Sequence, residues 1–304
     1  MKDLAIIVLC YNSREHLPRC LGSLRTAMNG MDATAFLVDN ASTDGSAVYV
    51  QTKFKWCTVI HSQRNGGYSY GNNLGLRAAG FPEEPLFRYV MLLNPDTELP
   101  AHALPDMLAY MKDNSNIGVL GPKLLLDDGS LDNACKRGVP TPATAFFHFS
   151  GLSLLFPRSL IFGRYNMTFV DADETADVDS TVGACQMIRG EALSLVGLLD
   201  ETFFMYGEDL DLNLRIRQVG YRVVYYPPVV VKHLKGSSTR KEPERMIRAF
   251  YKSMKIFHRK HFAGDHTALF NALVYAVVDL ICRYKLLRNC LKPPGRRAVG
   301  SAPE

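Results

Sequence analysis

Four acidic residues, at three places in this chain, could bind a cation or move a proton. Asp39 ends the apolar stretch TAFLVDN, Asp96 follows RYVMLLN, and Glu208 and Asp209 lie together in YGEDLDLNL. Carboxylate oxygens are the ligands that hard divalent cations prefer, and a carboxylate can deprotonate a hydroxyl as a general base. These residues are therefore the first candidates for a site.

The elements around these residues are those of an α/β protein. Unbroken apolar runs predict buried strands at residues 3–12, 34–40, 57–62 and 88–94. Helical patterns alternate with them at 13–27, 42–54 and 68–80. Such alternation predicts a parallel sheet whose ligands bind beyond the carboxyl ends of the strands, where Asp39 and Asp96 fall.

The second half of the chain is less regular. The sequence predicts a long connection over 127–180, a strand and short helix in 182–201, a loop and helix in 203–221, and a strand over 221–234 interrupted by Pro227 and Pro228. The apolar N-terminal run reads as a strand rather than a signal peptide. The seven cysteines include no CxxC pair, which favours a reducing cytoplasm over a disulfide framework.

The motifs together resemble glycosyltransferase family 2. The matching stretches are YN at 11–12, VDNASTDGS at 38–46, RNGGYSYGNNLGLRAA at 64–79, NPD at 94–96, YGEDLDLNLRIRQVGY at 206–221 and VKHLKGSS at 231–238. The subgroup that the chain most resembles transfers rhamnose or a related sugar. The resemblance implies a GT-A fold, an α/β domain around a Rossmann-like, mostly parallel sheet, over residues 1–240. Its nucleotide-binding half would be 1–126 and its acceptor half 127–240.

The resemblance implies a nucleotide-sugar donor, dTDP- or UDP-linked. Donor contacts are expected from Tyr11, Asn12, Asp39, Arg64, Asn65, Gly67, Asn72, Asn94 and Ser237. Asp39 would accept the imide N–H of a uracil or thymine base, although an Asx turn is the alternative. Residues 64–67 would bring backbone N–H groups close to phosphate or sugar, although they could form only a turn, and Asn72 could simply cap a helix.

The metal site implied by the resemblance is incomplete in this chain. The family usually has Asp-x-Asp where this sequence has Asn94-Pro95-Asp96, so one carboxylate is missing. We expect Asp96 to bind Mg²⁺ or Mn²⁺ directly, Asn94 to contact the ribose or diphosphate, and His233 to complete the site. A structural role is the alternative for His233.

Catalysis is expected at the start of the helix near residue 208. Inversion at an anomeric carbon needs one general base, and Asp209 matches the base of the family. Glu208 would hold the acceptor or a nearby loop. The alternative is that both acids simply favour the positive end of the helix dipole.

The tail is basic, and the body is acidic. Residues 232–304 carry 16 Lys and Arg against 5 Asp and Glu, whereas residues 1–231 carry 19 against 25. Bases alternate with apolar residues over 245–262, the pattern of an amphipathic helix on an anionic membrane surface. The alternative is that the charged face of this helix is simply exposed to solvent. The uncharged run at 267–278 is too short to span a bilayer and could be re-entrant or form a homodimer. No nucleic-acid module is recognised.

We therefore expect a metal-assisted, inverting glycosyltransferase with a helical tail over 241–304, located in the cytoplasm at the inner face of the cell membrane. Rhamnose from dTDP-rhamnose is the preferred sugar, and a growing glycan or a polyprenyl-diphosphate-linked glycan is the expected acceptor. One alternative is a transferase of UDP-hexose or UDP-N-acetylhexosamine. The other is a non-catalytic subunit that binds a sugar nucleotide and anchors a partner enzyme.

Overall fold

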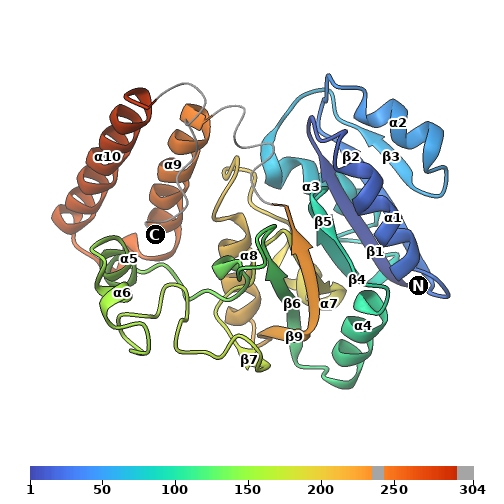
Figure 1. Cartoon of the computed structure of the whole chain (residues 1–304). Helices are drawn as coiled ribbons and strands as arrows, with labels where there is room; N and C mark the ends of the chain where they lie inside the picture. Colours follow the sequence, from blue (N-terminus) through green and yellow to red (C-terminus); the bar gives the residue numbers. More distant parts are fainter. Residues whose placement is uncertain (235–242, 293–304) are drawn as a thin grey trace.

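The computed structural model describes residues 1–234 and 243–292 and places a mixed sheet between helices (Figure 1). The strands are β1 (Lys2–Cys10), β2 (Ala33–Asp39), β3 (Thr58–His61), β4 (Phe87–Leu93), β5 (Thr97–Glu98), β6 (Ile117–Leu125), β7 (Ala176–Asp177), β8 (Cys185–Arg189) and β9 (Arg222–His233). The α-helices are α1 (Leu17–Ala27), α2 (Ser46–Lys53), α3 (Gly67–Ala78), α4 (Ala103–Asp113), α5 (Pro142–Phe149), α6 (Leu152–Leu155), α7 (Gly190–Val196), α8 (Glu208–Gln218), α9 (Pro243–His261) and α10 (Ala268–Cys290). Short 3-10 helices cover η1 (Asn133–Cys135) and η3 (Ala263–Asp265).

The sheet has the order β3-β2-β1-β4-β8-β6-β9-β5, and β7 pairs with β9. The first four strands of this order are parallel, and β8 is antiparallel to both β4 and β6. The predicted α/β class with a mostly parallel, Rossmann-like sheet is confirmed. The strands at 3–12, 34–40, 57–62 and 88–94 are confirmed as β1 to β4.

One hydrophobic core joins the two predicted halves. It includes Leu4 in β1 and Val231 in β9, and β8 from the second half lies directly beside β4 from the first. The division into 1–126 and 127–240 therefore remains a prediction about roles within one continuous sheet. Pro227 and Pro228 do not end the last strand; β9 continues past them, with a shift in its register against β6.

Helix α3 lies unusually close to the sheet because it carries glycines on the facing side. A Cβ on Gly75 would come 2.5 Å from Cγ2 of Ile7, and one on Gly71 would come 2.3 Å from Cδ1 of Leu9. Interiors are packed too densely to accept such an atom without displacement. The glycines thus let α3 hold the preceding loop, 62–66, against the ends of β1 and β2.

The described part of the predicted tail, residues 243–292, contains the α-helices α9 and α10, and α9 packs against the body of the protein. The apolar residues of α9 are buried, and they include Met246, Ile247, Tyr251, Ile256 and Phe257. Ile256 and Phe257 pack with Phe203 from the body. The expectation that the apolar face of this helix lies on a bilayer is therefore corrected, because protein already covers it. Within residues 1–234 and 243–292, no helix has the length and apolar character required to cross a membrane.

Candidate active site

The carboxyl ends of β1, β2 and β4 meet at one edge of the sheet, as parallel pairing requires. Cys10 at the end of β1 lies opposite Asp39 at the end of β2. Tyr11 follows β1 directly and is half-buried, while Asp39 is buried with its Oδ1 accepting from the Ser42 N–H at 3.3 Å. The Asx-type turn at Asp39 is present, and it leaves the strand end facing the same edge as Tyr11.

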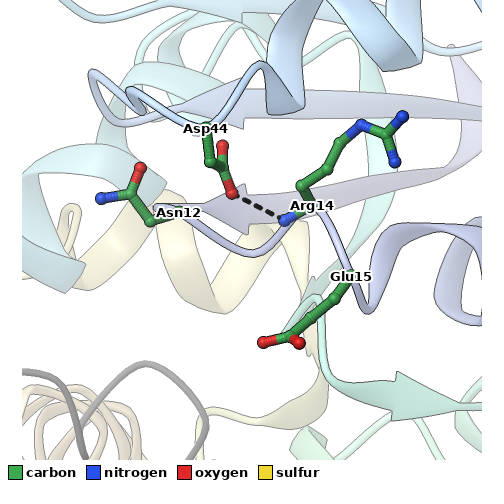
Figure 2. Close-up of a pocket in the computed structure, with 4 residues that line it drawn as sticks. All are labelled: Asn12, Arg14, Glu15 and Asp44. Carbon is green, nitrogen blue, oxygen red and sulfur yellow. Dashed lines mark hydrogen bonds between the residues drawn. The ribbon is translucent and has the colours of Figure 1, made fainter.

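An open pocket of about 450 Å³ lies beside this edge. Its lining residues are Asn12, Arg14, Glu15 and Asp44 (Figure 2). Asn12 Oδ1 accepts from the Thr43 N–H at 2.8 Å, and Asp44 accepts from the Arg14 N–H at 2.9 Å. Asn12 therefore orders the turn after β2 as well as lining the pocket. Sequence reasoning did not find Arg14 or Glu15, which carry no motif of their own.

The loop before α3 is organised by Asn40, which follows Asp39. The Asn40 amide donates to Asn65 Oδ1 at 3.0 Å and to the Gly67 carbonyl at 3.1 Å. Gly67 has a φ of +90°, and a Cβ there would lie 2.1 Å from the carbonyl oxygen of Phe204. Gly67 is therefore required for close packing of two loops, and Asn65 has its side-chain oxygen engaged within the protein.

Two other predicted donor contacts differ in their exposure. Arg64 is exposed, with its guanidinium over the ring of Tyr70 at 5.1 Å from the centroid. Asn72 is buried at 1% exposure and donates to the Tyr68 carbonyl at 3.0 Å. The geometry places Arg64 where a ligand could reach it and gives Asn72 a structural position inside α3.

Asp96 and His233 are brought together by a short antiparallel pairing. Thr97 in β5 lies opposite His233 in β9, and the Asp96 carbonyl accepts from the Leu234 N–H at 2.8 Å. As a result His233 Nε2 lies 3.6 Å from Asp96 Oδ1. The other ring nitrogen, Nδ1, lies 3.0 Å from Oδ2 of Asp132, which the sequence did not single out. Burial lowers the pKa of His233, but Asp132 and Asp96 outweigh that effect and raise it to about 9.

This arrangement could hold a divalent cation with few protein ligands, provided that binding displaces the Nε2 proton of His233. Asp96 Oδ1 is buried and makes no hydrogen bond within the described residues, and an imidazole nitrogen faces it. Adjacent ligands of one such cation lie about 3 Å apart, near the observed spacing. No group of three or more His, Cys, Asp or Glu side chains that could hold a metal is found in residues 1–234 and 243–292. A cation here would therefore depend on diphosphate oxygens and water for its remaining ligands.

The two other residues predicted near this site are Asn94 and Ser237. Asn94 follows β4 and is half-buried; its N–H donates to the Ala184 carbonyl at 2.8 Å, and its carbonyl accepts from the Thr97 hydroxyl at 2.7 Å. These backbone bonds fix the turn that presents Asp96. Ser237 lies outside the described residues.

Asp209 is held by a buried ion pair at the start of α8. Its Oδ2 accepts from Arg137 Nη2 at 2.6 Å and from the Gly183 N–H at 3.0 Å, while Oδ1 accepts from the Leu210 N–H at 2.8 Å. The Asp209 side chain is only 7% exposed and that of Arg137 15%. Such charge-assisted bonds fix the orientation of the carboxylate. Arg137 lies just after η1 and was not identified from the sequence.

Glu208 differs from its neighbour because no cation contacts it. It is buried, and its Oε2 has no hydrogen-bond partner among the described residues. Burial raises the pKa of Glu208, and the adjacent Asp209 carboxylate raises it further. Burial and the Asp209 carboxylate therefore favour the protonated form of Glu208, whereas Asp209 is paired with Arg137.

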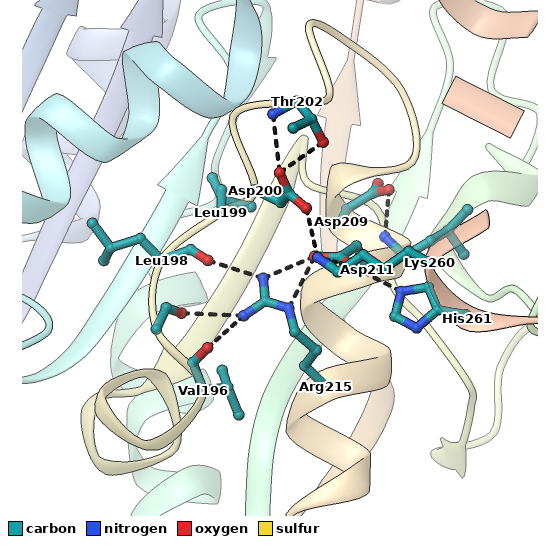
Figure 3. A network of polar contacts seen from close by, with 12 residues as sticks. Val196, Leu198, Leu199, Asp200, Thr202, Asp209, Asp211, Arg215, Lys260 and His261 are labelled. Carbon is teal, nitrogen blue, oxygen red and sulfur yellow. Dashed lines mark hydrogen bonds and ion pairs between the residues drawn. The ribbon is translucent and has the colours of Figure 1, made fainter. Parts of the chain in front are cut away.

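Helix α9 is held to α8, which carries Asp209, by contacts with Asp211. The carboxylate of Asp211 accepts from Arg215 at 2.9 Å, from Lys260 at 2.7 Å and from His261 at 2.8 Å (Figure 3). Lys260 also lies 2.6 Å from Asp200. The acidic start of α8 thus serves both as a site for Asp209 and as the anchor of the C-terminal helices.

Comparison with known proteins agrees with this geometry. Residues 5–136 match the sequence profile of Glycosyl transferase family 2. This match covers the first part of the chain and agrees with the resemblance predicted from the motifs. The chain is 29% identical over 266 residues, 86% of this chain and 85% of the other, to an N-acetylglucosaminyl-diphospho-decaprenol L-rhamnosyltransferase from Mycobacterium tuberculosis.

Solved glycosyltransferase structures share the predicted GT-A fold with this chain. S. aureus TarS has a TM-score of 0.55 at 17% identity, with 94% of this chain and 73% of that one covered. A mannosyltransferase from Pyrobaculum calidifontis, in complex with GDP-Man and Mn²⁺, has a TM-score of 0.54 at 16% identity, with 96% and 78% covered. The predicted fold and the predicted enzyme class are confirmed.

Proposed function

We propose that the protein transfers rhamnose from dTDP-rhamnose, with inversion, to a hydroxyl of a growing, lipid-linked cell-surface glycan. The observation that carries this proposal is the similarity to a rhamnosyltransferase of a diphosphate-linked lipid along most of both chains. The structure supports it with one carboxylate, Asp209, that Arg137 holds in place through a contact of 2.6 Å. A single base is what a one-step displacement at an anomeric carbon needs.

In this proposal the donor lies along the edge formed by the ends of β1, β2 and β4. Tyr11 and Asp39 would contact the base, and exposed Arg64 would contact the diphosphate. Asn12, Asn65 and Gly67 would shape the loops around the nucleotide. The Asn12 N–H donates to the Ser42 hydroxyl at 2.9 Å, and the Gly67 N–H donates to Asn65 Oδ1 at 3.1 Å. Asn94 and Ser237 keep their predicted contacts to the ribose or diphosphate as proposals.

Asp209 acts on the acceptor. Its carboxylate takes the proton of the acceptor hydroxyl while the oxygen attacks the anomeric carbon, and the bond from that carbon to the diphosphate breaks. Arg137 and the Gly183 N–H hold Oδ2 through the reaction. Glu208, which favours its protonated form, contributes a hydrogen-bond donor rather than a second base.

We propose that Asp96 and His233 hold a Mg²⁺ or Mn²⁺ ion. When bound, such an ion supplies positive charge against the diphosphate leaving group. Asp132 fixes the ring of His233 so that Nε2 faces Asp96. Support comes from the unbonded, buried Asp96 Oδ1 and from Mn²⁺ in structures that share the fold.

The acceptor places the enzyme at a membrane. We infer cytoplasmic, peripheral attachment at the inner, anionic face of the cell membrane, because a polyprenyl-linked acceptor is confined there. Residues 1–240 would bind both substrates, and residues 241–304 would complete the acceptor side as a helical extension. A homodimer through 267–278, the alternative to membrane attachment for this run, stays a prediction.

The test is a transfer assay with the purified full chain. It would be incubated with Mn²⁺, a GlcNAc-diphosphate-polyprenol and either dTDP-rhamnose or UDP-GlcNAc, and products would be identified by mass spectrometry and NMR. The proposal predicts a rhamnosylated product with inverted anomeric configuration. Product only from UDP-GlcNAc would move the donor to a UDP sugar, and no product from either donor would contradict the proposal.

A further inference from the structure

The long connection between η1 and β7 exposes a cluster of large apolar side chains. Their relative exposure lies between 52% and 72%. This 146–161 surface comprises Phe146, Leu154, Leu155, Phe156, Leu160 and Ile161. Scattered exposed apolar residues are ordinary, but six within 16 consecutive positions mark a surface that binds something.

The 146–161 surface is held in shape by aromatic contacts and local hydrogen bonds beneath it. The ring of Phe162 contacts Phe147 at 4.9 Å and Phe156 at 5.4 Å between centroids. The Gly163 N–H donates to the Ser159 carbonyl at 2.9 Å, and the Ile161 N–H donates to the Ser159 hydroxyl at 3.2 Å. The apolar side chains are therefore presented outward by packed aromatic rings and local hydrogen bonds.

The charge of the segment around the 146–161 surface indicates which kind of partner would bind there. Residues 133–170 contain no Asp or Glu. Arg158, in the middle of the surface, is exposed and has no ion pair within the described part of the chain. Two copies facing each other here would bring like charges together with no acid to offset them. Apolar side chains around a free arginine instead suit the headgroup region of an anionic bilayer.

A second apolar face lies at the same end of the molecule. One side of α10 packs on α9, with Val278 against Ile247 and Tyr251. The other side exposes Leu269, Leu273, Val277 and Leu280, and its last turns carry exposed Arg283 and Arg288. Figure 1 shows α5, α6 and α10 together at one end, away from α2 and β3.

This end of the molecule is also the acceptor side of the proposed site. Arg137, which contacts Asp209, lies five residues before α5 begins at Pro142. The same segment is tied back by the Val139 N–H, which donates to Asp179 at 3.0 Å. A lipid-linked substrate in a bilayer beneath α5 and α6 would thus be carried close to the Asp209 carboxylate.

We propose that the 146–161 surface, with the exposed face of α10, is the membrane-binding surface of the protein and inserts into the headgroup region of an anionic bilayer. This inference rests on the proposed function, because it gives the lipid-linked acceptor a route to Asp209. It assigns attachment to a loop in the middle of the chain and to α10, rather than to α9.

The test is flotation of the full chain with vesicles of phosphatidylcholine alone or mixed with phosphatidylglycerol. We expect binding to the anionic vesicles, weakened by high salt. The double variant Leu155→Ser/Leu160→Ser should bind them about tenfold more weakly, since two side chains that enter the bilayer are lost. The matched control Val48→Ser/Leu195→Ser removes equally exposed apolar residues elsewhere and should bind as the wild type does.

A spectroscopic variant tests insertion directly. In Phe156→Trp, indole emission should shift to shorter wavelength on adding anionic vesicles and be quenched by brominated lipid, relative to the parent, which has only Trp56. Equal vesicle binding by the Leu155/Leu160 variant and the wild type would overturn the proposal. So would an unshifted Trp emission, or a dimer in lipid-free solution that the Leu155/Leu160 variant dissociates.

Failure of this inference can be told apart from failure of the proposed function. Calorimetric titration with dTDP and Mn²⁺, without vesicles, reports the donor site alone and should give the same affinity for the wild type and the Leu155/Leu160 variant. Donor binding without vesicle binding would overturn only the membrane surface. Vesicle binding without donor binding would support the membrane surface and contradict the proposed function.

Discussion

Arg137 and Asp209 form a buried ion pair, with Nη2 of the arginine 2.6 Å from Oδ2 of the aspartate. The two residues are 72 positions apart, and their contact joins the segment after η1 to the start of α8. Because Arg137 is mostly buried, it fixes the direction in which the Asp209 carboxylate faces. The pair is thus both a structural link and the support of the proposed base.

Replacing Arg137 should lower both stability and turnover. Arg137→Met leaves a buried carboxylate without its cation, so we expect a loss of about 3 kcal/mol in the free energy of unfolding and a fall in kcat of about 100-fold. Arg137→Lys should recover part of both. Denaturant unfolding of Arg137→Met, Asp209→Asn and the double variant completes a double-mutant cycle. If the losses in unfolding free energy of the two single variants add up to that of the double variant, the two residues are not coupled.

Asp132 should control cation affinity through His233. Asp132→Asn keeps the shape of the side chain but weakens its hold on the imidazole Nδ1, so we expect a loss of about 10- to 100-fold in Mn²⁺ affinity. Electron paramagnetic resonance of free Mn²⁺ during titration of the full chain with dTDP measures this without any turnover. Asp127→Asn, an exposed acid just after β6, is the control and should bind as the wild type does. Equal affinity in both variants would remove Asp132 as a positioning residue.

Glu208 should make stability fall as the pH rises. Its folded-state pKa is raised by burial and by Asp209, so between the ordinary carboxyl pKa of about 4.3 and the raised value the folded protein must keep a proton that the unfolded chain releases. Its stabilising contribution is therefore complete at low pH and is lost through this window. Glu208→Gln has no proton to lose.

The measurement is the melting temperature of both proteins from about pH 5 to about pH 8. The difference in Tm, Glu208→Gln minus wild type, should increase with pH. The exposed Glu191→Gln should show a difference that does not change. A difference for Glu208→Gln that is flat or decreases would mean that Glu208 is ionised in the folded protein.

Asp211 should be a stability residue rather than a catalytic one. It is fully buried and accepts from Arg215, Lys260 and His261, so Asp211→Asn removes the charge that holds α9 to α8. We expect a loss of about 3 kcal/mol in unfolding free energy, by denaturant titration. Asp279→Asn, whose pair with Lys255 is exposed, should cost less than about 1 kcal/mol. Equal losses of unfolding free energy in the two variants would show that the buried Asp211 network stabilises the protein no more than an exposed ion pair does.

The sequence was informative about local elements and about residues that follow strands. Apolar runs predicted β1 to β4, and the ends of β2 and β4 placed Asp39 and Asp96 at one edge because parallel strands share a direction. The family resemblance placed His233, and the antiparallel pairing of β5 with β9 then brought it to Asp96. The strand predictions needed only periodicity, order and strand direction, whereas His233 also needed the family resemblance.

Contacts between distant segments could not be predicted in this way. Asp132 and His233 are 101 positions apart, and neither residue type nor spacing links them. The amphipathic pattern of α9 correctly indicated a helix with an apolar face. It could not show that Phe203 and its neighbours, rather than a bilayer, cover that face. An amphipathic pattern indicates that one face of a helix is buried, but it does not show whether protein or lipid covers that face.

The measurement that tests the central claim most directly is a comparison of donor binding and transfer in Asp209→Asn. The variant should bind dTDP with Mn²⁺ within about threefold of the wild type, because in the proposed site Asp209 would contact the acceptor and not the donor. Transfer should fall by about 1,000-fold or more, since the only proposed base is lost. Turnover near the wild-type rate, with donor binding intact, would show that Asp209 is not the base and would contradict the account.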